Sequence, residues 1–281
     1  MDSKITIGGQ AVIEGVMMRS QNKYAVCVRN PKKKISTKII SVNKKHSWFS
    51  QLPIVRGCFR FAESMIIGIQ SLEWSATESQ GEEEGSIKPL ELFTMFAASI
   101  GITIVLFYMI PLFLTRILTD KSGIVFNLID GALRILIFIL YLLLISLFPD
   151  IKRVFQYHGA EHKTVSCFES KQKLTVANVQ KFSTFHPRCG TSFVLIVFVF
   201  SILLFSLVGV EGYFPRLGLR LLMLPVIAGI SYETLRFSAK HSSNILVKIL
   251  IAPGLWLQRI TTKQPTDDMV EVAIASLKAA L

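Results

Sequence analysis

Two histidines and a glutamate with helical spacing are the residues of this sequence best suited to chemistry. Residues 157–162 read YHGAEH. On a helix, His158 and His162 project from one face, which is the geometry that two imidazoles need to bind one metal ion. Glu161 lies beside them, where its carboxylate can accept a proton from metal-bound water. The spacing therefore predicts a divalent metal site with Glu161 as catalytic base, although Gly159 disfavours a helix here.

A second segment, HPRCG at residues 186–190, offers two further metal ligands. Two residues separate His186 from Cys189, which is the spacing of a metal-binding knuckle, and the glycine allows a tight turn. Zinc is the ion that such a mixture of nitrogen and sulfur ligands favours. We expect one metal ion to be held by His158, His162, His186 and Cys189.

Three other interpretations of these residues stay open. A structural metal site closed by the same ligands would need no catalysis. Without metal, the histidines would form hydrogen bonds near lipid headgroups. A thiol mechanism, with Cys189 as nucleophile and a histidine as base, is an enzymatic variant. The carboxylate of Glu161, which a structural site does not need, favours the catalytic metal site, and H-x-x-E-H is also the inverted zinc-peptidase pattern.

Polar residues interrupt the apolar N-terminal segment GGQAVIEGVMMR, residues 8–19. Its glycines suggest tight turns or close approach of another backbone. The segment would face the metal loop and contribute to substrate binding, although such residues also form hydrogen-bonded networks inside small sheets. We expect substrate to be bound by Gln10, Glu14, Arg19 and Arg188.

Long uncharged runs indicate that these residues belong to an integral membrane protein. Apolar residues make up 51% of the chain and charged residues 18%, against about a quarter charged in a soluble domain. We expect transmembrane helices at Leu92–Thr115, Gly131–Pro149, Cys189–Val210 and Leu217–Tyr232. The last holds Arg220 and Pro225 and is either a full span or a short re-entrant one. Pro111 should kink the first span, and Arg134 should extend from the mouth of the second to the lipid–water interface.

The basic residues predict the orientation of the chain. Segments 1–91, 150–190 and 233–281 hold most of the 31 Lys and Arg residues, and four spans place all three segments on one side. By the positive-inside rule, both termini and the central loop of this multi-pass cell-membrane protein are cytoplasmic. Cytoplasmic loops facing anionic lipids explain the net charge of +12. We therefore expect the lipid bilayer and a membrane protein as partners, and no nucleic acid.

The sequence divides into three regions: a β region with an interfacial helix (1–90), a four-helix membrane region that contains the metal-site loop 150–190 (91–233), and an amphipathic tail (234–281). The expected fold is a mainly α membrane protein with four transmembrane helices, a small N-terminal β-sheet and cytoplasmic amphipathic helices.

Turn and cap signals mark the elements outside the membrane. Residues 30–33, Asn-Pro-Lys-Lys, read as a turn between two strands. After Pro53 the apolar residues take helical spacing, which predicts an amphipathic helix in the membrane interface. A second interfacial segment covers 245–260. A last helix, 269–281, follows a predicted side-chain cap at residues 266–268.

Four blocks of the sequence resemble the YqhQ-like family of bacterial membrane proteins: GGQAVIEGVMMR at 8–19, YHGAEHKT at 157–164, HPRCGTSF at 186–193 and PGLWLQRITT at 253–262. The likeness extends over essentially the whole chain. That family is a domain of unknown function described as predicted metal-dependent enzymes. The resemblance implies a multi-pass protein and supports the five candidate residues of the metal loop. The chain departs from the family at residues 20–21 and 264–265, which affects those turns and not the metal loop.

Two functions from different classes follow. The first is a zinc-dependent membrane enzyme, a hydrolase at the cytoplasmic face, with Glu161 as its base. The second is a noncatalytic scaffold or assembly factor with a structural metal site and an N-terminal sheet that binds a partner. A transporter is a weaker third choice, because the spans carry few ionisable residues.

Overall fold

The computed structural model describes residues 7–42, 52–81, 89–120, 123–207, 212–241 and 244–281. The chain is mainly helical and begins with an antiparallel sheet, as the sequence predicts. The strands are β1 (Gly8–Val12), β2 (Gly15–Arg19), β3 (Lys23–Arg29) and β4 (Ile35–Ser41). The helices are α1 (Val55–Gln80), α2 (Pro89–Ile104), the π-helical turn η2 (Val105–Met109), α3 (Ile110–Leu118), α4 (Gly123–Ile145), α5 (Pro149–Glu169), α6 (Val176–Val179), α7 (Gly190–Leu207), α8 (Tyr213–Lys240), α9 (Ile245–Thr261) and α10 (Asp267–Ala280).

The sheet is a meander in which each strand pairs with the next. Ile13 and Glu14 form the turn between β1 and β2, where Glu14 has a φ of 51°. Gly15 follows because a Cβ at that position would lie 2.1 Å from the carbonyl oxygen of Cys27. The predicted turn at 30–33 joins β3 to β4, so the predicted N-terminal sheet is confirmed.

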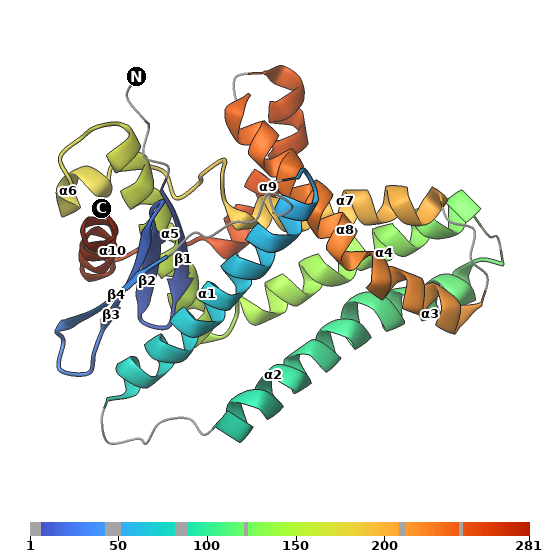
Figure 1. Ribbon diagram of the computed structural model, residues 1–281, viewed down its shortest axis with the longest axis horizontal. Coiled ribbons are helices and arrows are strands. Elements are labelled where there is room, and N and C mark those ends of the chain that lie inside the picture. The colour runs from blue at the N-terminus through green and yellow to red at the C-terminus, as the bar shows by residue number, and fades with distance from the viewer. Residues whose placement is uncertain (1–6, 43–51, 82–88, 121–122, 208–211, 242–243) are drawn as a thin grey trace.

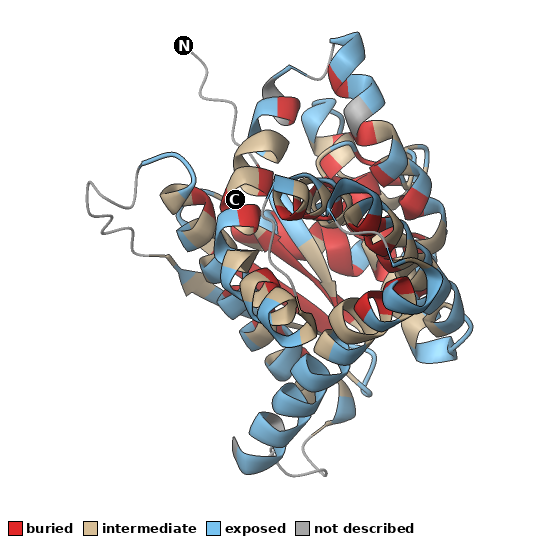
Figure 2. Cartoon of the chain, turned by 90° about the vertical axis from the view of Figure 1, so that its right-hand side faces the viewer, coloured by how far each residue is buried: buried red, intermediate tan, exposed pale blue. Residues whose placement is uncertain are grey.

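Helices cover both faces of the sheet (Figure 1). On one face, Met18 and Cys27 pack in a core with α5 and α10. On the opposite face, Met17 and Val26 pack against Ile67 of α1. The middle of the sheet is therefore buried on both sides (Figure 2). This double burial explains why β3 carries apolar side chains at successive positions.

The last helix, α10, is part of this core. Met269, Val272 and Leu277 are buried against the sheet, far along the chain from the strands that they contact. The predicted helix is present, but its predicted cap is not formed. The hydroxyl of Thr266 donates to the carboxylate of Asp268 and does not accept a backbone N–H.

Within the described residues, four helical segments are long and apolar enough to cross a membrane: Phe93–Leu118, Gly123–Ile145, Gly190–Leu207 and Tyr213–Ser238. They correspond to the four predicted spans, and the last is 26 residues long, which favours a full span over a short one. At most 28% of any of these segments is buried, so most side chains are available to lipid. A π-helical turn interrupts the first span just before Pro111, where a kink is predicted.

A buried ionic cluster joins the second and fourth spans. Asp130 accepts hydrogen bonds of 2.9 Å from Arg134 on its own helix and from Arg220 on α8. The guanidinium of Arg134 also lies 4.8 Å from the ring centre of Tyr108. The prediction that Arg134 reaches the lipid–water interface is therefore wrong. Inside the bundle the guanidinium has an ionic partner, which a lipid-facing position would not provide.

Asp130→Asn should destabilise the membrane region, because two buried guanidinium groups lose the carboxylate that neutralises them. Breaking a buried ion pair costs about 3–5 kcal/mol. We therefore expect a clearly lower Tm for the detergent-solubilised variant. Asp120→Asn removes the same charge at an exposed position and serves as the matched control. Equal Tm values for the two variants would show that the cluster does not stabilise the bundle.

Candidate metal centre

Helix α5 carries His158, Glu161 and His162, as their spacing predicts. The helix continues through Gly159 because the chain passes very close at this point. A Cβ on Gly159 would lie 2.0 Å from the carbonyl oxygen of Lys263. The low helix propensity of glycine is thus offset by packing that no other residue would allow.

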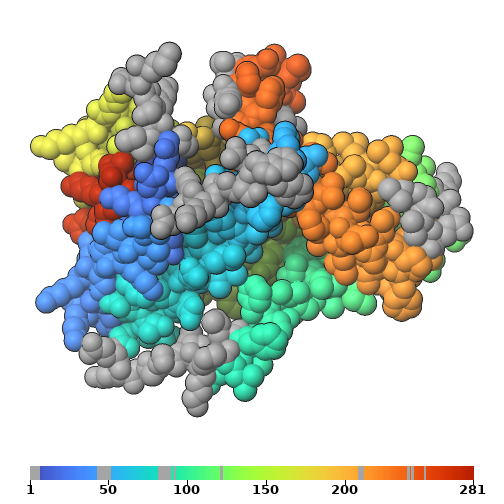
Figure 3. Space-filling model, viewed as in Figure 1, coloured from blue at the N-terminus to red at the C-terminus, as the bar shows by residue number. Residues whose placement is uncertain are grey.

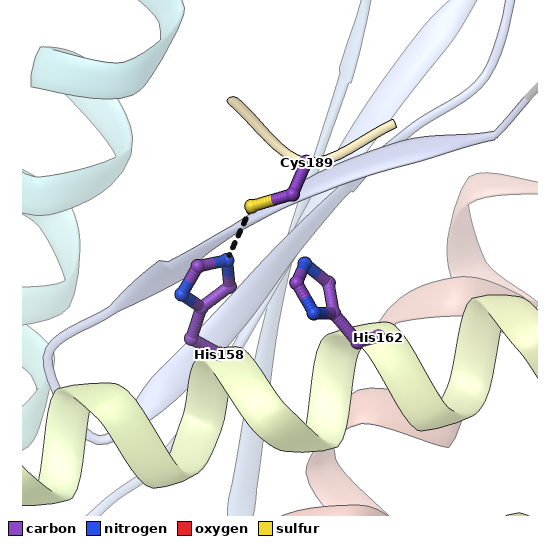
Figure 4. A group of neighbouring side chains, drawn as sticks. All are labelled: His158, His162 and Cys189. Atoms are coloured by element: carbon purple, nitrogen blue, oxygen red, sulfur yellow. Dashed lines mark hydrogen bonds between the residues drawn. The ribbon is translucent and has the colours of Figure 1, made fainter. Parts of the chain in front are cut away.

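Cys189 completes a group of three side chains that offer metal-ligand atoms (Figure 4). It lies one residue before Gly190, where α7 begins. Its Sγ is 3.2 Å from Nε2 of His158, and the ligand atoms of His158, His162 and Cys189 all lie within 4.8 Å of one another. Figure 4 shows both imidazoles projecting from one side of α5 toward the sulfur. The structure therefore brings together the two separated stretches that the sequence singles out.

Backbone carbonyls orient both imidazoles of α5. Nδ1 of His158 lies 2.8 Å from the carbonyl oxygen of Thr261, and Nδ1 of His162 lies 2.5 Å from that of Thr184. A carbonyl oxygen only accepts hydrogen bonds, so in the neutral rings each Nδ1 carries the proton and each Nε2 presents a lone pair. Metal-binding histidines typically have such a second partner.

Burial controls the protonation of these groups. It lowers the pKa of His162 to about 2, with the nearby His158 adding to the effect. It raises the pKa of the Cys189 thiol, against hydrogen bonds from Thr191 that lower it. It also raises the pKa of Glu161 to about 7, against the opposing charge of His158. The imidazole of His162 is thus in the form that binds metal, whereas the thiol has to lose its proton on binding.

Glu161 lies beside the three candidate ligands. Its Oε2 is 3.6 Å from Nε2 of His162 and 3.9 Å from Nε2 of His158, distances that are too long for direct hydrogen bonds. A Cβ on Gly9 of β1 would lie 2.7 Å from Cγ of Glu161. The N-terminal segment therefore packs directly on the predicted base.

His186 lies close to this group but outside it. Its ring centre is 5.7 Å from that of His162. Its Nδ1 accepts the backbone N–H of Arg188 at 3.3 Å, and its Nε2 lies 3.6 Å from a carboxylate oxygen of Glu169. The amide of Gln258 on α9 binds the backbone of His186 in both directions, at 2.9 and 3.0 Å. The role of His186 as a metal ligand stays a prediction.

Two of the four residues that are predicted to bind substrate form ion pairs with residues of α5. Arg188 pairs with Glu169. Its charge also acts on Glu161, whose pKa it lowers against the larger effect of burial. Glu14 makes two hydrogen bonds of 2.5 Å with Arg153 in the first half of α5. Arg188 is thus near the candidate metal centre, whereas Glu14 links the β1–β2 turn to α5.

The other two, Gln10 and Arg19, face away from the centre. Successive side chains of a strand point to opposite faces. Because Gly9 faces Glu161, Gln10 faces α1, and its side chain packs against that helix. Arg19 also extends to α1, where it pairs with Glu63 at 2.9 Å. Both residues line a cavity of about 470 Å³ on that side.

Three arginines that were not predicted as site residues line the same cavity: Arg56, Arg60 and Arg236. The spacing of Arg56 and Arg60 is a visible signal, because residues four apart share one face of a helix. The carbonyls of Thr184 and Thr261 have no such signal, since every residue supplies a carbonyl.

Comparison with known proteins gives one family and one relative. The model of the family described as "Protein of unknown function (DUF1385)" matches residues 52–281, which include all the candidate metal ligands. The chain is 33% identical to "Uncharacterized protein YqhQ" of Bacillus subtilis (strain 168) over an alignment of 298 positions, gaps included, and the alignment covers 98% of this chain and 92% of the relative. No solved structure matches the chain.

Gly9→Ala tests the contact between β1 and Glu161. The added methyl group would lie less than 3.0 Å from the Glu161 side chain and from the carbonyl oxygen of Met17. Overpacking of this kind costs about 1–3 kcal/mol, so we expect a lower Tm. Gly8→Ala is the control, since its Cβ would meet nothing within 4 Å. If Gly9→Ala and Gly8→Ala both have the Tm of the wild type, β1 does not pack on Glu161 as described.

Proposed function

The chain belongs to the DUF1385 family, and we propose that it is a metal-dependent membrane enzyme, a hydrolase that acts at the cytoplasmic face. In this proposal His158, His162 and Cys189 hold one zinc ion, and Glu161 is the general base. The observation that carries the proposal is the convergence of two imidazole nitrogens and one sulfur within 4.8 Å.

The distance between two of the candidate ligands fits a tetrahedral zinc site. Zinc binds histidine nitrogen at about 2.0–2.1 Å and cysteine sulfur at about 2.3 Å, so neighbouring ligands of a tetrahedral site lie roughly 3.5 Å apart. The 3.2 Å between Nε2 of His158 and Sγ of Cys189 is close to that value. The carbonyls on both Nδ1 atoms already hold the imidazoles in the tautomer that binds metal.

The number of ligands supports catalysis. Structural zinc sites normally have four protein ligands, whereas catalytic sites have three and leave one position for water or substrate. Among the described residues, three side chains make up this group. Glu161 adjoins two of them without a direct hydrogen bond to either imidazole. That placement suits a base that works on a ligand in the fourth position.

In this proposal Glu161 and Arg188 have separate roles in hydrolysis. A bound zinc ion would supply a water molecule of lowered pKa and polarise the substrate. Glu161 would act as the general base through Oε2, taking a proton from the attacking water and delivering it to the leaving group. The positive charge of Arg188, which already acts on Glu161, orients an anionic or amide-bearing substrate. The basic segments that flank the spans support a cytoplasmic location for this centre and for both termini.

A structural metal site in a noncatalytic scaffold is the second candidate. The observation that favours it is the proximity of His186, whose ring centre is 5.7 Å from that of His162. If His186 left Glu169, it would supply the fourth ligand that closes a structural site. The two candidates therefore differ in the state of His186 and in the need for Glu161.

The first test is metal content. Purified wild-type protein should hold about one equivalent of zinc by elemental analysis, and His162→Ala should lose most of it, because three ligands define the site. His241→Ala removes an exposed histidine at the end of α8 and should keep the metal. Wild-type protein without stoichiometric metal would rule out both candidates.

The second test separates catalysis from structure. Glu161→Gln should keep the zinc but lose about 10²–10⁴-fold in rate, the usual contribution of a general base. To measure this rate, the zinc-loaded protein is incubated with a membrane extract, and mass spectrometry follows how fast compounds of the extract are consumed. Turnover by the variant at the wild-type rate would remove Glu161 from the chemistry. An extract left unchanged by the wild type would favour the scaffold.

A further inference from the structure

An arginine-lined cavity lies on the other side of the sheet from the candidate metal centre. It measures about 470 Å³ and is bounded by β1, β2, α1 and the C-terminal part of α8. Figure 3 shows α1 between the strands and α8 on this face of the molecule. The residues that give the cavity its character are Arg19, Arg56, Arg60, Arg236, Ser64 and Tyr232.

Two carboxylates partly neutralise these arginines. Arg19 and Arg60 both contact Oε2 of Glu63, at 2.9 and 3.1 Å. Arg56 makes two hydrogen bonds with the carboxylate of Glu233 on α8. Neither carboxylate is among the residues that line the cavity. Four positive and two negative charges therefore leave an excess of two positive charges beside it.

Arg236 is the least engaged of the four arginines. Its Nη1 lies 3.9 Å from Oε2 of Glu233, beyond hydrogen-bond range, and its side chain is 44% exposed. A guanidinium has five N–H donors. Arg236 can therefore donate to a ligand without giving up a hydrogen bond to Glu233.

This chemistry matches a phosphate group. The planar donor fork of arginine fits phosphate oxygens in pairs. The excess of two positive charges balances the charge of a phosphate monoester, which carries up to two negative charges. The hydroxyl groups of Ser64 and Tyr232 add neutral hydrogen-bond donors to the same lining. A volume of about 470 Å³ lies within the range of small-molecule sites and accommodates a headgroup.

The position of the cavity favours a lipid as the source of the phosphate. Tyr232 and Arg236 lie in the last turns of the apolar segment Tyr213–Ser238, where a transmembrane helix reaches the membrane surface. Phe59 and Ile66 of α1 are exposed, as in a helix that lies in the lipid interface. Phosphate groups of phospholipids are concentrated at this level.

We propose that this cavity binds the phosphate monoester headgroup of an anionic membrane phospholipid. The site uses guanidinium groups on α1, β2 and α8, and it includes none of the candidate metal ligands. It is therefore independent of the proposed hydrolase, and the failure of one leaves the other intact. Bound lipid would also join the N-terminal sheet to the membrane-spanning helix α8.

Lipid affinity of the purified full-length protein tests the proposal. The protein should bind phosphatidic acid in phosphatidylcholine nanodiscs and show no binding to phosphatidylcholine alone. Arg236→Gln and Arg60→Gln should each weaken the binding of phosphatidic acid about tenfold, the loss of one charged hydrogen bond. Arg259→Gln, which removes an exposed arginine of α9, should leave the affinity unchanged. Equal affinity of Arg236→Gln, Arg60→Gln and wild type would overturn the proposal.

Two further measurements identify the source of the phosphate and separate the two sites. Glycerol 3-phosphate should compete with phosphatidic acid only weakly, because it lacks the contribution of the bilayer. Binding of glycerol 3-phosphate as tight as that of phosphatidic acid would overturn the lipid assignment in favour of a soluble ligand. His162→Ala should bind phosphatidic acid with wild-type affinity even where it has lost its metal. Loss of lipid binding in that variant would contradict the independence of the sites.

Discussion

The close path of residues 261–264 along α5 is the constraint on which the candidate metal centre depends. Gly159 permits this path, because any side chain at that position would strike the backbone of residue 263. Three hydrogen bonds then join the two segments: Lys263 N–H to the Phe155 carbonyl, the Gln156 amide to the Gln264 carbonyl, and His158 Nδ1 to the Thr261 carbonyl. The last of these fixes the tautomer of His158, the first of the candidate ligands. Gly159, which would weaken an isolated helix, thus allows the backbone approach that positions the imidazole of His158.

The centre also depends on how the membrane helices sit against the sheet. Two of its candidate ligands come from α5, which packs on the sheet, and the third, Cys189, directly precedes the membrane-spanning helix α7. A shift of α7 relative to α5 would change the distance between sulfur and imidazole directly. Gln258 of α9 restrains this junction, because its amide donates to and accepts from the backbone of His186. The distances between the candidate ligands therefore depend on how the membrane region packs against the N-terminal sheet.

Features that depend on the periodicity of the sequence could be predicted from it. Features that depend on contacts between residues of different elements could not. Apolar runs locate the four spans, and the spacing of His158 and His162 places both imidazoles on one helix face. The burial of Arg134 could not be predicted in this way, because its partner Asp130 lies just outside the expected span and Arg220 lies on another helix. The same limit applies to the arginine-lined cavity. Its members come from four separate elements, which only the fold brings together.

The register of β1 decides which site each face of the sheet serves. A shift of one residue would turn Gln10 toward Glu161 and Gly9 toward α1. A glutamine does not fit at a position where a single Cβ would already lie 2.7 Å from the carboxylate side chain. The ion pair of Glu14 with Arg153 ties the β1–β2 turn to α5 and so resists such a shift. Glu14, which stays a predicted substrate ligand, therefore also helps to hold the strand that separates the arginine-lined cavity from the candidate metal centre.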